Sequence, residues 1–366
     1  MLSIYKKLSF VISILFITTC VGQGFEYKKV NFDIKFQSVK VEDYNEAIDA
    51  SIYIKNYNSA EENTENIQNL LNEYKIVKLP NREIIVSDEG LSLNSGNILI
   101  FQTNTILRIK PNAKNAYELL RIHNVDDVII INPKLIGDRF KHKSKTGEQG
   151  HGISIRNSRN VSVYNFEIKD FWGDGIFIGR LNDTGCDNIN LISGWIDNNR
   201  RNGLSIVSGA NIKVENLLIS NTNGTLPMYG VDIEPHYNID VINGLKFKNI
   251  RTYNNQEGGF RIMLGKLAGS KEKRIQIILN NYEDINSKVG LDIARIEQNL
   301  EKIYGEITIN NVILKKNITP VVVKNNQNSK IKIQLNNFNI IESKRKAFDK
   351  KELIRVINNR QNIEYY

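Results

Sequence analysis

The sequence predicts an all-β fold: a single right-handed parallel β-helix, or solenoid, with an N-terminal helical cap. Three observations lead to this prediction: a glycine-centred segment that recurs six times, a second series of short β-branched segments between these repeats, and turns rich in asparagine. The glycines of the first series are separated by 23, 28, 27, 29 and 31 residues. A period in the twenties is typical of solenoids, in which stacked coils bury a continuous apolar column.

The first element, residues 1–23, is predicted to be a signal peptide. Lys6 and Lys7 precede an apolar stretch at residues 8–17, which is too short to span a membrane comfortably. We expect cleavage near residues 22–24. The sequence therefore predicts export, to the periplasm or the medium, with no membrane span.

The two cysteines fit this interpretation. Lipid modification of Cys20 is an alternative to ordinary cleavage. Thr19 speaks against it, because a smaller residue usually precedes a lipidated cysteine. If Cys20 is removed or lipidated, Cys186 has no partner for an intrachain disulfide. Stability is therefore expected to come from the core.

The mature chain divides into three predicted parts. Residues 24–75 form a polar segment and a capping helix, whose apolar residues recur at helical spacing: Ile67, Leu70, Leu71 and Tyr74. Asn63 or Thr64 is expected to cap its start. Residues 76–345 form the β-helix, and residues 346–366 form a C-terminal tail or cap.

The two series of segments are expected to supply two columns of strands. The glycine series comprises Gly152–Ile155, Gly175–Ile178, Gly203–Ile206, Gly230–Ile233, Gly259–Ile262 and Gly290–Ile293. The other series comprises Val128–Ile131, Val161–Tyr164, Ile189–Ile192, Ile212–Val214, Leu245–Phe247, Ile275–Ile278, Ile307–Ile309 and Ile331–Ile333. Because side chains alternate along a strand, the first and third residues after each glycine point inward and the second points outward.

Aligning the coils by their glycines predicts a patch of functional residues on one outer face. Neighbouring coils lie about 4.8 Å apart, so residues three coils apart lie within about 15 Å. The patch holds carboxylates, arginines and a tyrosine but no lysine: Asp174, Arg201, Asn202, Tyr229, Asp232, Glu234 and Arg261. A solvated basic surface would show the opposite composition.

Asp232 and Glu234 are the main catalytic candidates. Residues at i and i+2 of a strand face the same way, with Cα atoms roughly 6.6–7 Å apart. Like charges this close disfavour joint ionisation, so one carboxyl can keep a proton and act as an acid. A carboxyl separation of about 6.5–9.5 Å would indicate an inverting hydrolase. The alternative is an exposed acidic pair that Arg261 and His236 neutralise.

Four further residues are candidates with weaker patterns. Asp174 precedes a glycine, which is typical of a turn, but its coil lies beside Arg201, so it is expected to assist catalysis. Arg200 and Arg201 are expected to bind a carboxylate or sulfate of a substrate. His151 is a candidate sugar ligand or a structural histidine. No cofactor is predicted, although Asp174, Asp232 and Glu234 together leave a calcium site open.

These residues and the repeat resemble the pectin-lyase-like right-handed parallel β-helix superfamily, over about residues 60–345. The resembling motifs are Gly137-Asp138-Arg139, Gly147–Ile153, Trp172–Ile176, Asn198–Ile206 and Gly230–Pro235. Alignment with polygalacturonases, glycoside hydrolases of this superfamily, carries their catalytic aspartate over to Asp174. Arg201 and Asn202 replace their aspartate pair, and Tyr229 replaces their histidine. The resemblance therefore implies the fold and a carbohydrate substrate, but not the whole mechanism.

The predicted function is an exported glycoside hydrolase that cuts an acidic or sulfated polysaccharide, in keeping with the net charge of +9. Asp232, Glu234 and Asp174 would be catalytic, and Arg200, Arg201, Asn202, Tyr229, His151, His236 and Arg261 would bind the glycan. Two alternatives remain. A polysaccharide lyase would use Arg261, His236 or Tyr229 as the base, and a non-catalytic solenoid would only bind the glycan. Nucleic acid is not an expected partner, because this face carries acidic residues and no basic–aromatic ladder.

Overall fold

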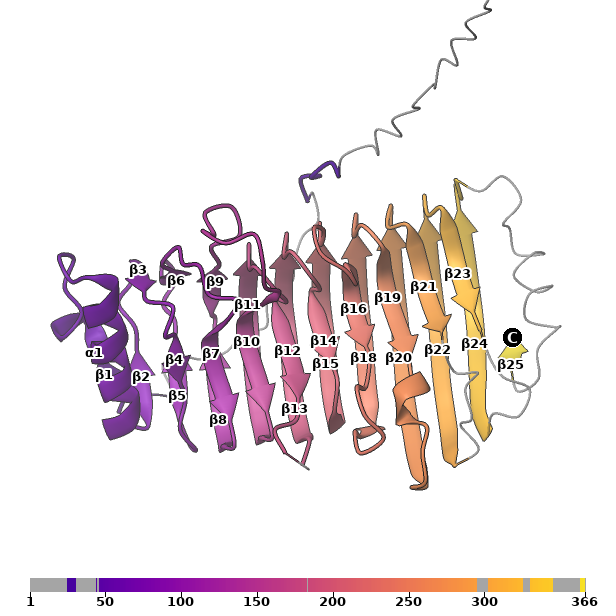
Figure 1. The fold of residues 1–366 in the computed structure, drawn as a ribbon, viewed down its shortest axis with the longest axis horizontal. Coiled ribbons are helices and arrows are strands. Elements are labelled where there is room, and N and C mark those ends of the chain that lie inside the picture. The colour runs from indigo at the N-terminus through magenta and orange to yellow at the C-terminus, as the bar shows by residue number, and fades with distance from the viewer. Residues whose placement is uncertain are drawn as a thin grey trace, which may run out of the picture.

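The computed structural model describes residues 25–30, 44, 46–182, 184–294, 302–324, 330–344 and 363–365. The chain is a right-handed parallel β-helix, as predicted, and its coils stack along one long axis (Figure 1). The predicted signal peptide and Cys20 lie outside the described residues. Among the described residues, no helix has the length and apolar content that a bilayer crossing requires.

Sheet B contains nine strands, which neighbour one another in chain order and include all six glycine segments. They are β4 (Leu91–Ser92), β7 (Ala116–His123), β10 (Gln149–Arg156), β12 (Ile176–Gly179), β14 (Leu204–Ile206), β16 (Tyr229–Ile233), β19 (Gly258–Met263), β21 (Val289–Ala294) and β23 (Thr319–Val323).

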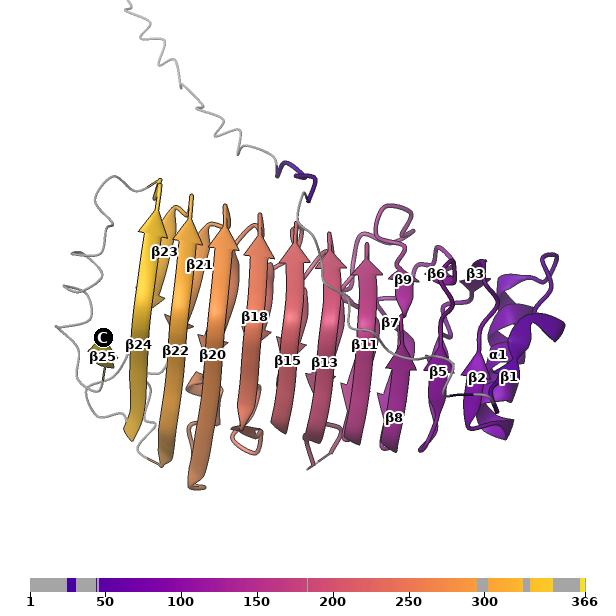
Figure 2. The same cartoon turned by 180° about the vertical axis from the view of Figure 1, so that it is seen from behind.

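Sheet A contains sixteen strands and includes all eight segments of the β-branched series (Figure 2). They are β1 (Ile48–Asp49), β2 (Ile76–Lys78), β3 (Glu83–Val86), β5 (Ile98–Ile100), β6 (Ile106–Ile109), β8 (Asp126–Ile131), β9 (Lys134–Ile136), β11 (Arg159–Lys169), β13 (Cys186–Asp197), β15 (Gly209–Ser220), β17 (Ile242–Asn243), β18 (Leu245–Tyr253), β20 (Lys273–Ile285), β22 (Ile303–Lys315), β24 (Lys330–Ile341) and β25 (Ile363–Tyr365).

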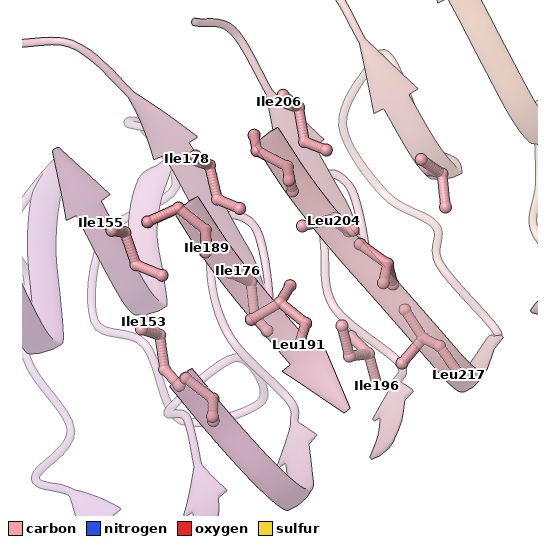
Figure 3. Close-up of a cluster of buried hydrophobic side chains, with 14 of the residues drawn as sticks. Ile153, Ile155, Ile176, Ile178, Ile189, Leu191, Ile196, Leu204, Ile206 and Leu217 are labelled. Carbon is pink, nitrogen blue, oxygen red and sulfur yellow. The ribbon is translucent and has the colours of Figure 1, made fainter. Parts of the chain in front are cut away.

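The core is the apolar column that the repeat predicts. Inward side chains of sheet B meet those of sheet A, and isoleucine stacks on isoleucine from one coil to the next (Figure 3). Ile153, Ile176 and Leu204, for example, are fully buried. Cys186 is a free, buried thiol at the edge of this column.

The glycines start the strands of sheet B because no side chain fits there. A Cβ at Gly203 would lie 2.2 Å from Ile219 Cγ2 and 2.7 Å from the carbonyl oxygen of Gly230. The other five glycines of the series have similar close neighbours from the next coil or from sheet A. Asparagine supplies the corners, as predicted, because it tolerates the left-handed conformation; Asn165, Asn216 and Asn249 have φ values of 54–56°.

The N-terminal helix α1 (Ala60–Glu73) covers the open end of the solenoid with Ile67, Leu70 and Leu71. The expected cap at Asn63 or Thr64 is wrong. Ser59 caps the helix by accepting from the N–H of Glu62, whose carboxylate accepts in turn from the N–H of Ser59. This reciprocal arrangement satisfies two N–H groups at once.

Short helices and the chain ends complete the fold. The 3-10 helices are η2 (Ala50–Ile52) and η3 (Gly265–Leu267). β25 adds a parallel strand next to β24, within the segment predicted as a tail or cap. Residues 26–28 lie against three successive coils. Tyr27 donates to Asp197, Lys28 exchanges backbone hydrogen bonds with the amide of Asn221, and Asn254 donates to the carbonyl of Glu26.

Candidate active site

The register of sheet B brings the predicted patch together on its outer face. Ser154, Phe177, Ser205, Asp232, Arg261 and Asp292 form one column of directly paired residues. The seven predicted patch residues all enter one polar network beside or within this column: Asp174, Arg201, Asn202, Tyr229, Asp232, Glu234 and Arg261. Acidic and basic residues alternate from coil to coil along this network.

The first part of the network surrounds Asp174, which precedes β12 and is fully buried. Arg201 Nη1 donates to Asp174 Oδ1 at 3.1 Å and to Oδ2 at 2.8 Å. The backbone N–H of Asn202 and the hydroxyl of Ser205 donate to the same carboxylate at 3.0 and 2.9 Å. The charge of Asp174 raises the pKa of Arg201. Asp174 and Arg201 therefore form an ion pair that fixes the position of the guanidinium.

Asn202 joins the two acidic coils. Its Nδ2 donates to Ser205 Oγ at 3.0 Å and to Asp232 Oδ2 at 3.2 Å, while its Oδ1 accepts from the N–H of Tyr229 at 3.0 Å. Because a buried amide that donates twice and accepts once has few other orientations, Asn202 fixes the relative positions of β14 and β16.

The second part of the network surrounds Arg261 on β19. Its Nε and Nη2 donate to the two oxygens of Asp232, each at 2.8 Å, and Nη2 also donates to Glu234 Oε2 at 3.0 Å. Asp232 is 2% exposed, whereas the side chain of Glu234 is 28% exposed. Of the three predicted catalytic carboxylates, Glu234 is the one that reaches solvent.

The environment of Glu234 favours its protonated form. Burial and then the charge of Asp232 raise the pKa of Glu234 above its ordinary range, although Arg261 and Arg201 oppose the shift. Both carboxylates bind one nitrogen atom of Arg261. Their two bonded oxygen atoms therefore lie less than about 6 Å apart, and the separation of about 6.5–9.5 Å between carboxyl groups that an inverting hydrolase uses stays a prediction.

Tyr229 and Asp292 close the network on the side of β21. Tyr229 Oη donates to Asp292 Oδ2 at 2.8 Å, and the guanidinium of Arg261 lies 4.6 Å from the centre of the tyrosine ring. Burial raises the pKa of Tyr229 far above its ordinary value, and burial also raises the pKa of Asp292. Tyr229 therefore remains a hydrogen-bond donor at neutral pH.

Three predicted site residues lie at the margin. His151 is fully buried: its Nδ1 accepts from the N–H of Asp174 at 3.1 Å, and burial lowers its pKa to about 4. Arg200 turns away from the network, because its guanidinium lies 3.7 Å from the ring centre of Trp172 and donates to the carbonyl of Gly147. His236 is exposed beyond Glu234.

Sequence reasoning missed two members of the network. Ser205 is the second residue after Gly203 and so faces outward, but it is not among the predicted patch residues; it is a buried donor to Asp174. Asp292 is the second residue after Gly290, two coils beyond Asp232, and it joins the network by accepting from the hydroxyl of Tyr229. Their outward positions after glycine were the available signal.

The oxygen atoms that could form a calcium site already bind guanidinium groups: those of Asp174 bind Arg201, and those of Asp232 and Glu234 bind Arg261. Among the described residues, no group of three or more histidine, cysteine, aspartate or glutamate side chains is arranged to hold a metal ion.

Fold and site together define a right-handed parallel β-helix that carries an ion-paired network on one sheet. No protein-family model matches the chain. Two Bacillus subtilis proteins are similar in sequence: the SPbeta prophage-derived uncharacterized protein YorA, 27% identical over 192 residues, and the uncharacterized protein YclG, 30% identical over 162 residues. The matches cover 44% and 40% of this chain but only 33% and 28% of those proteins.

Three solved structures share the fold. An endo-xylogalacturonan hydrolase from Aspergillus tubingensis matches with a TM-score of 0.60 and 11% identity, over 80% of this chain and 85% of that one. The A-module of the Azotobacter vinelandii mannuronan C-5 epimerase AlgE6 matches with a TM-score of 0.53 and 13% identity, over 81% of this chain and 94% of that one. The Streptococcus pneumoniae surface protein and adhesin PfbA matches with a TM-score of 0.53 and 12% identity, over 87% of this chain and 88% of that one. At these identities the likeness establishes the fold alone.

Proposed function

We propose that the protein is an exported polysaccharide-degrading enzyme, a glycoside hydrolase that acts on an acidic or sulfated glycan bound across the outer face of sheet B. The observation that carries this proposal is Glu234, a partly exposed carboxyl with a raised pKa that lies beside Arg261 in an otherwise buried network. The endo-xylogalacturonan hydrolase with the same fold supports a carbohydrate substrate.

In this proposal Glu234 donates a proton to the oxygen of the leaving sugar. Its raised pKa keeps that proton available closer to neutral pH than an ordinary glutamate would. Asp232 supplies the second carboxylate, and an anionic group of the glycan draws Arg261 away from it. This exchange would couple substrate charge to catalysis, because Asp232 becomes free only when another anion binds the guanidinium.

Arg201 and Arg261 are the proposed anion-binding groups. Their side chains are 13% and 12% exposed, so each guanidinium reaches the surface while its buried carboxylate partner fixes its position. A guanidinium held in place binds a carboxylate or sulfate with little further loss of entropy. His151 and Arg200, by contrast, are assigned supporting positions around the network.

One observation favours a second candidate, a polysaccharide lyase. Tyr229 keeps its proton, contacts Arg261 and has an acidic partner in Asp292. A phenol that keeps its proton can protonate the oxygen of the leaving sugar in β-elimination, while Arg261 neutralises the uronate carboxylate and His236 removes the sugar proton as the base. A non-catalytic glycan-binding solenoid remains the third candidate.

Replacing Glu234 tests the hydrolase proposal. Glu234→Gln is expected to lower turnover of the best acidic or sulfated polysaccharide at least 100-fold, in the range that loss of a general acid produces. Release of reducing ends reports hydrolysis, and near-ultraviolet absorbance of an unsaturated uronate reports elimination. Glu167→Gln is the matched control, since Glu167 pairs with Lys169 on the outer face of sheet A, and it should keep full activity.

The outcomes separate the three candidates. Reducing ends without absorbance, lost in Glu234→Gln, support hydrolysis. Absorbance that Tyr229→Phe abolishes supports elimination instead. Binding of anionic polysaccharides without turnover, unchanged in Glu234→Gln, would leave a binding protein and refute the enzymatic proposal.

A further inference from the structure

A second candidate site lies on sheet A, on a different sheet from the network around Glu234. A groove with a volume of about 620 Å³ crosses five successive strands: β15, β18, β20, β22 and β24. It is lined mainly by asparagine and apolar residues: Asn216, Leu217, Leu218, Asn249, Ile250, Arg251, Asn281, Tyr282, Glu283, Asn311, Val312, Ile313, Asn337 and Asn339.

A row of left-handed asparagines runs along the groove. One asparagine in each of the five strands has a left-handed φ of 54–57°, which interrupts the extended conformation of the strand at that residue. These asparagines stack as a ladder in which each Nδ2 donates to the Oδ1 of the preceding coil. The bonds are 2.8 Å from Asn249 to Asn216, 3.0 Å from Asn281 to Asn249, 3.1 Å from Asn311 to Asn281 and 2.9 Å from Asn337 to Asn311.

A second row of amides lies one residue earlier in three of these strands, outside the lining of the groove. Asn310 Nδ2 donates to Asn280 Oδ1 at 2.7 Å, and Asn336 Nδ2 donates to Asn310 Oδ1 at 2.6 Å. Each ladder bond uses one of the two N–H groups of an amide and one lone pair of its oxygen. The groove therefore presents a regular array of groups that can both donate and accept.

The groove has no excess charge. Of its described lining residues, Arg251 and Glu283 are the charged ones, and they pair with each other at 2.5 Å. In the register of the sheet this pair lies between two apolar residues, the buried Leu218 and Ile313, and Ile313 is 39% exposed. A polyanion would gain little from this surface, whereas a ligand with hydroxyl groups and apolar C–H faces is complementary to it.

We propose that this groove binds an uncharged polysaccharide chain that lies parallel to the axis of the solenoid. The array repeats at the coil spacing of about 4.8 Å, which is comparable to the length of one pyranose in an extended chain, so successive sugars meet successive amides. Sugar hydroxyls, like amides, donate and accept. The proposal goes beyond the catalytic one and does not depend on it, because it concerns another sheet and a neutral ligand.

The test is affinity electrophoresis of the full chain in native gels that contain galactomannan, xyloglucan or dextran. The variant is Asn281→Gly with Asn311→Gly, because glycine adopts the left-handed conformation without strain while the amide is lost. Asn286→Gly is the matched control: Asn286 is also left-handed and bonded in a ladder, to Asn254, but outside the groove. Glu234→Gln separates this site from the proposed active site.

We expect at least one neutral polysaccharide to retard the wild-type protein, Glu234→Gln and Asn286→Gly alike, and the double variant to bind it at least tenfold more weakly while keeping the wild-type circular dichroism. Retardation by none of the three polymers, or equal retardation of the double variant, would overturn the proposal. So would a dimer in sedimentation that the double variant dissociates, since a second copy of the chain would then be the occupant.

Discussion

Asp284, on β20, is a fully buried carboxyl outside the proposed active site. Burial raises its pKa to about 7, although Thr252, Ser287 and Asn317 donate hydrogen bonds to it. In the unfolded chain an aspartate titrates near 3.9. The folded state therefore holds a proton that the unfolded state releases between these two values, and the stability gained from that proton is lost as pH rises through about 7.

This difference predicts a pH-dependent stability. The free energy of unfolding should fall by about 1.4 kcal/mol per pH unit from this group between about pH 4 and 7, and then level off. Urea unfolding at pH 5 and pH 8 measures the change, and Asp284→Asn should remove this part of it. Asp187→Asn, at a partly exposed position on β13, is the control. Equal pH dependence in wild type and Asp284→Asn would contradict the assignment.

At the scale of single residues, the sequence predicted which side chains lie close together but not which of them remain exposed to solvent. The alternation of strands placed Asp232, Glu234 and Arg261 on one face. It left the pairing of Arg261 with both carboxylates as an alternative, and it could not show that only Glu234 would stay partly exposed, because side-chain rotamers and the close packing of neighbouring coils decide that. Arg200 was misplaced for a similar reason, since Trp172 holds its guanidinium elsewhere.

At the scale of elements, the glycines at or near the beginning of six strands of sheet B set how closely the coils approach. Gly203 → Ala should destabilise the protein by about 1–3 kcal/mol, the usual cost of overpacking, since both Ile219 and the backbone of Gly230 obstruct a methyl group. Gly185→Ala is the control, because its nearest obstacle is one side-chain atom, Ser208 Oγ at 2.7 Å, while the nearest backbone atom is 3.4 Å away. Thermal unfolding of both variants measures the difference; equal melting temperatures would refute this account.

The elements were predictable where a periodic pattern marked them. The period of the glycines and the β-branched segments fixed both sheets, whereas the start of α1 depended on one local hydrogen-bonding motif. Ser59 and Glu62 have the serine-to-glutamate spacing of a capping box, and that spacing was the signal to use in place of Asn63 or Thr64. β25 was missed because only three residues of it pair with β24.

At the scale of the whole molecule, each coil is bonded mainly to the coils before and after it, so stability is expected to vary along the axis. Hydrogen exchange should be slowest in β12, β14 and β16, which have neighbours on both sides over many coils, and faster in β23 and β24 near the C-terminal end. Mass-spectrometric exchange of peptides checks this order. Uniform exchange of all strands would indicate one cooperative unit instead.

The active-site network draws on five consecutive strands of sheet B, from β12 to β21, and each of them touches only its immediate neighbours within the sheet. A gene duplication or deletion that added or removed a whole turn nearer either end would leave those five strands adjacent. Evolution can thus lengthen or shorten this protein in steps of about one repeat while the chemistry stays intact, whereas a turn inserted between β14 and β16 would separate Asn202 from Asp232 and dismantle it.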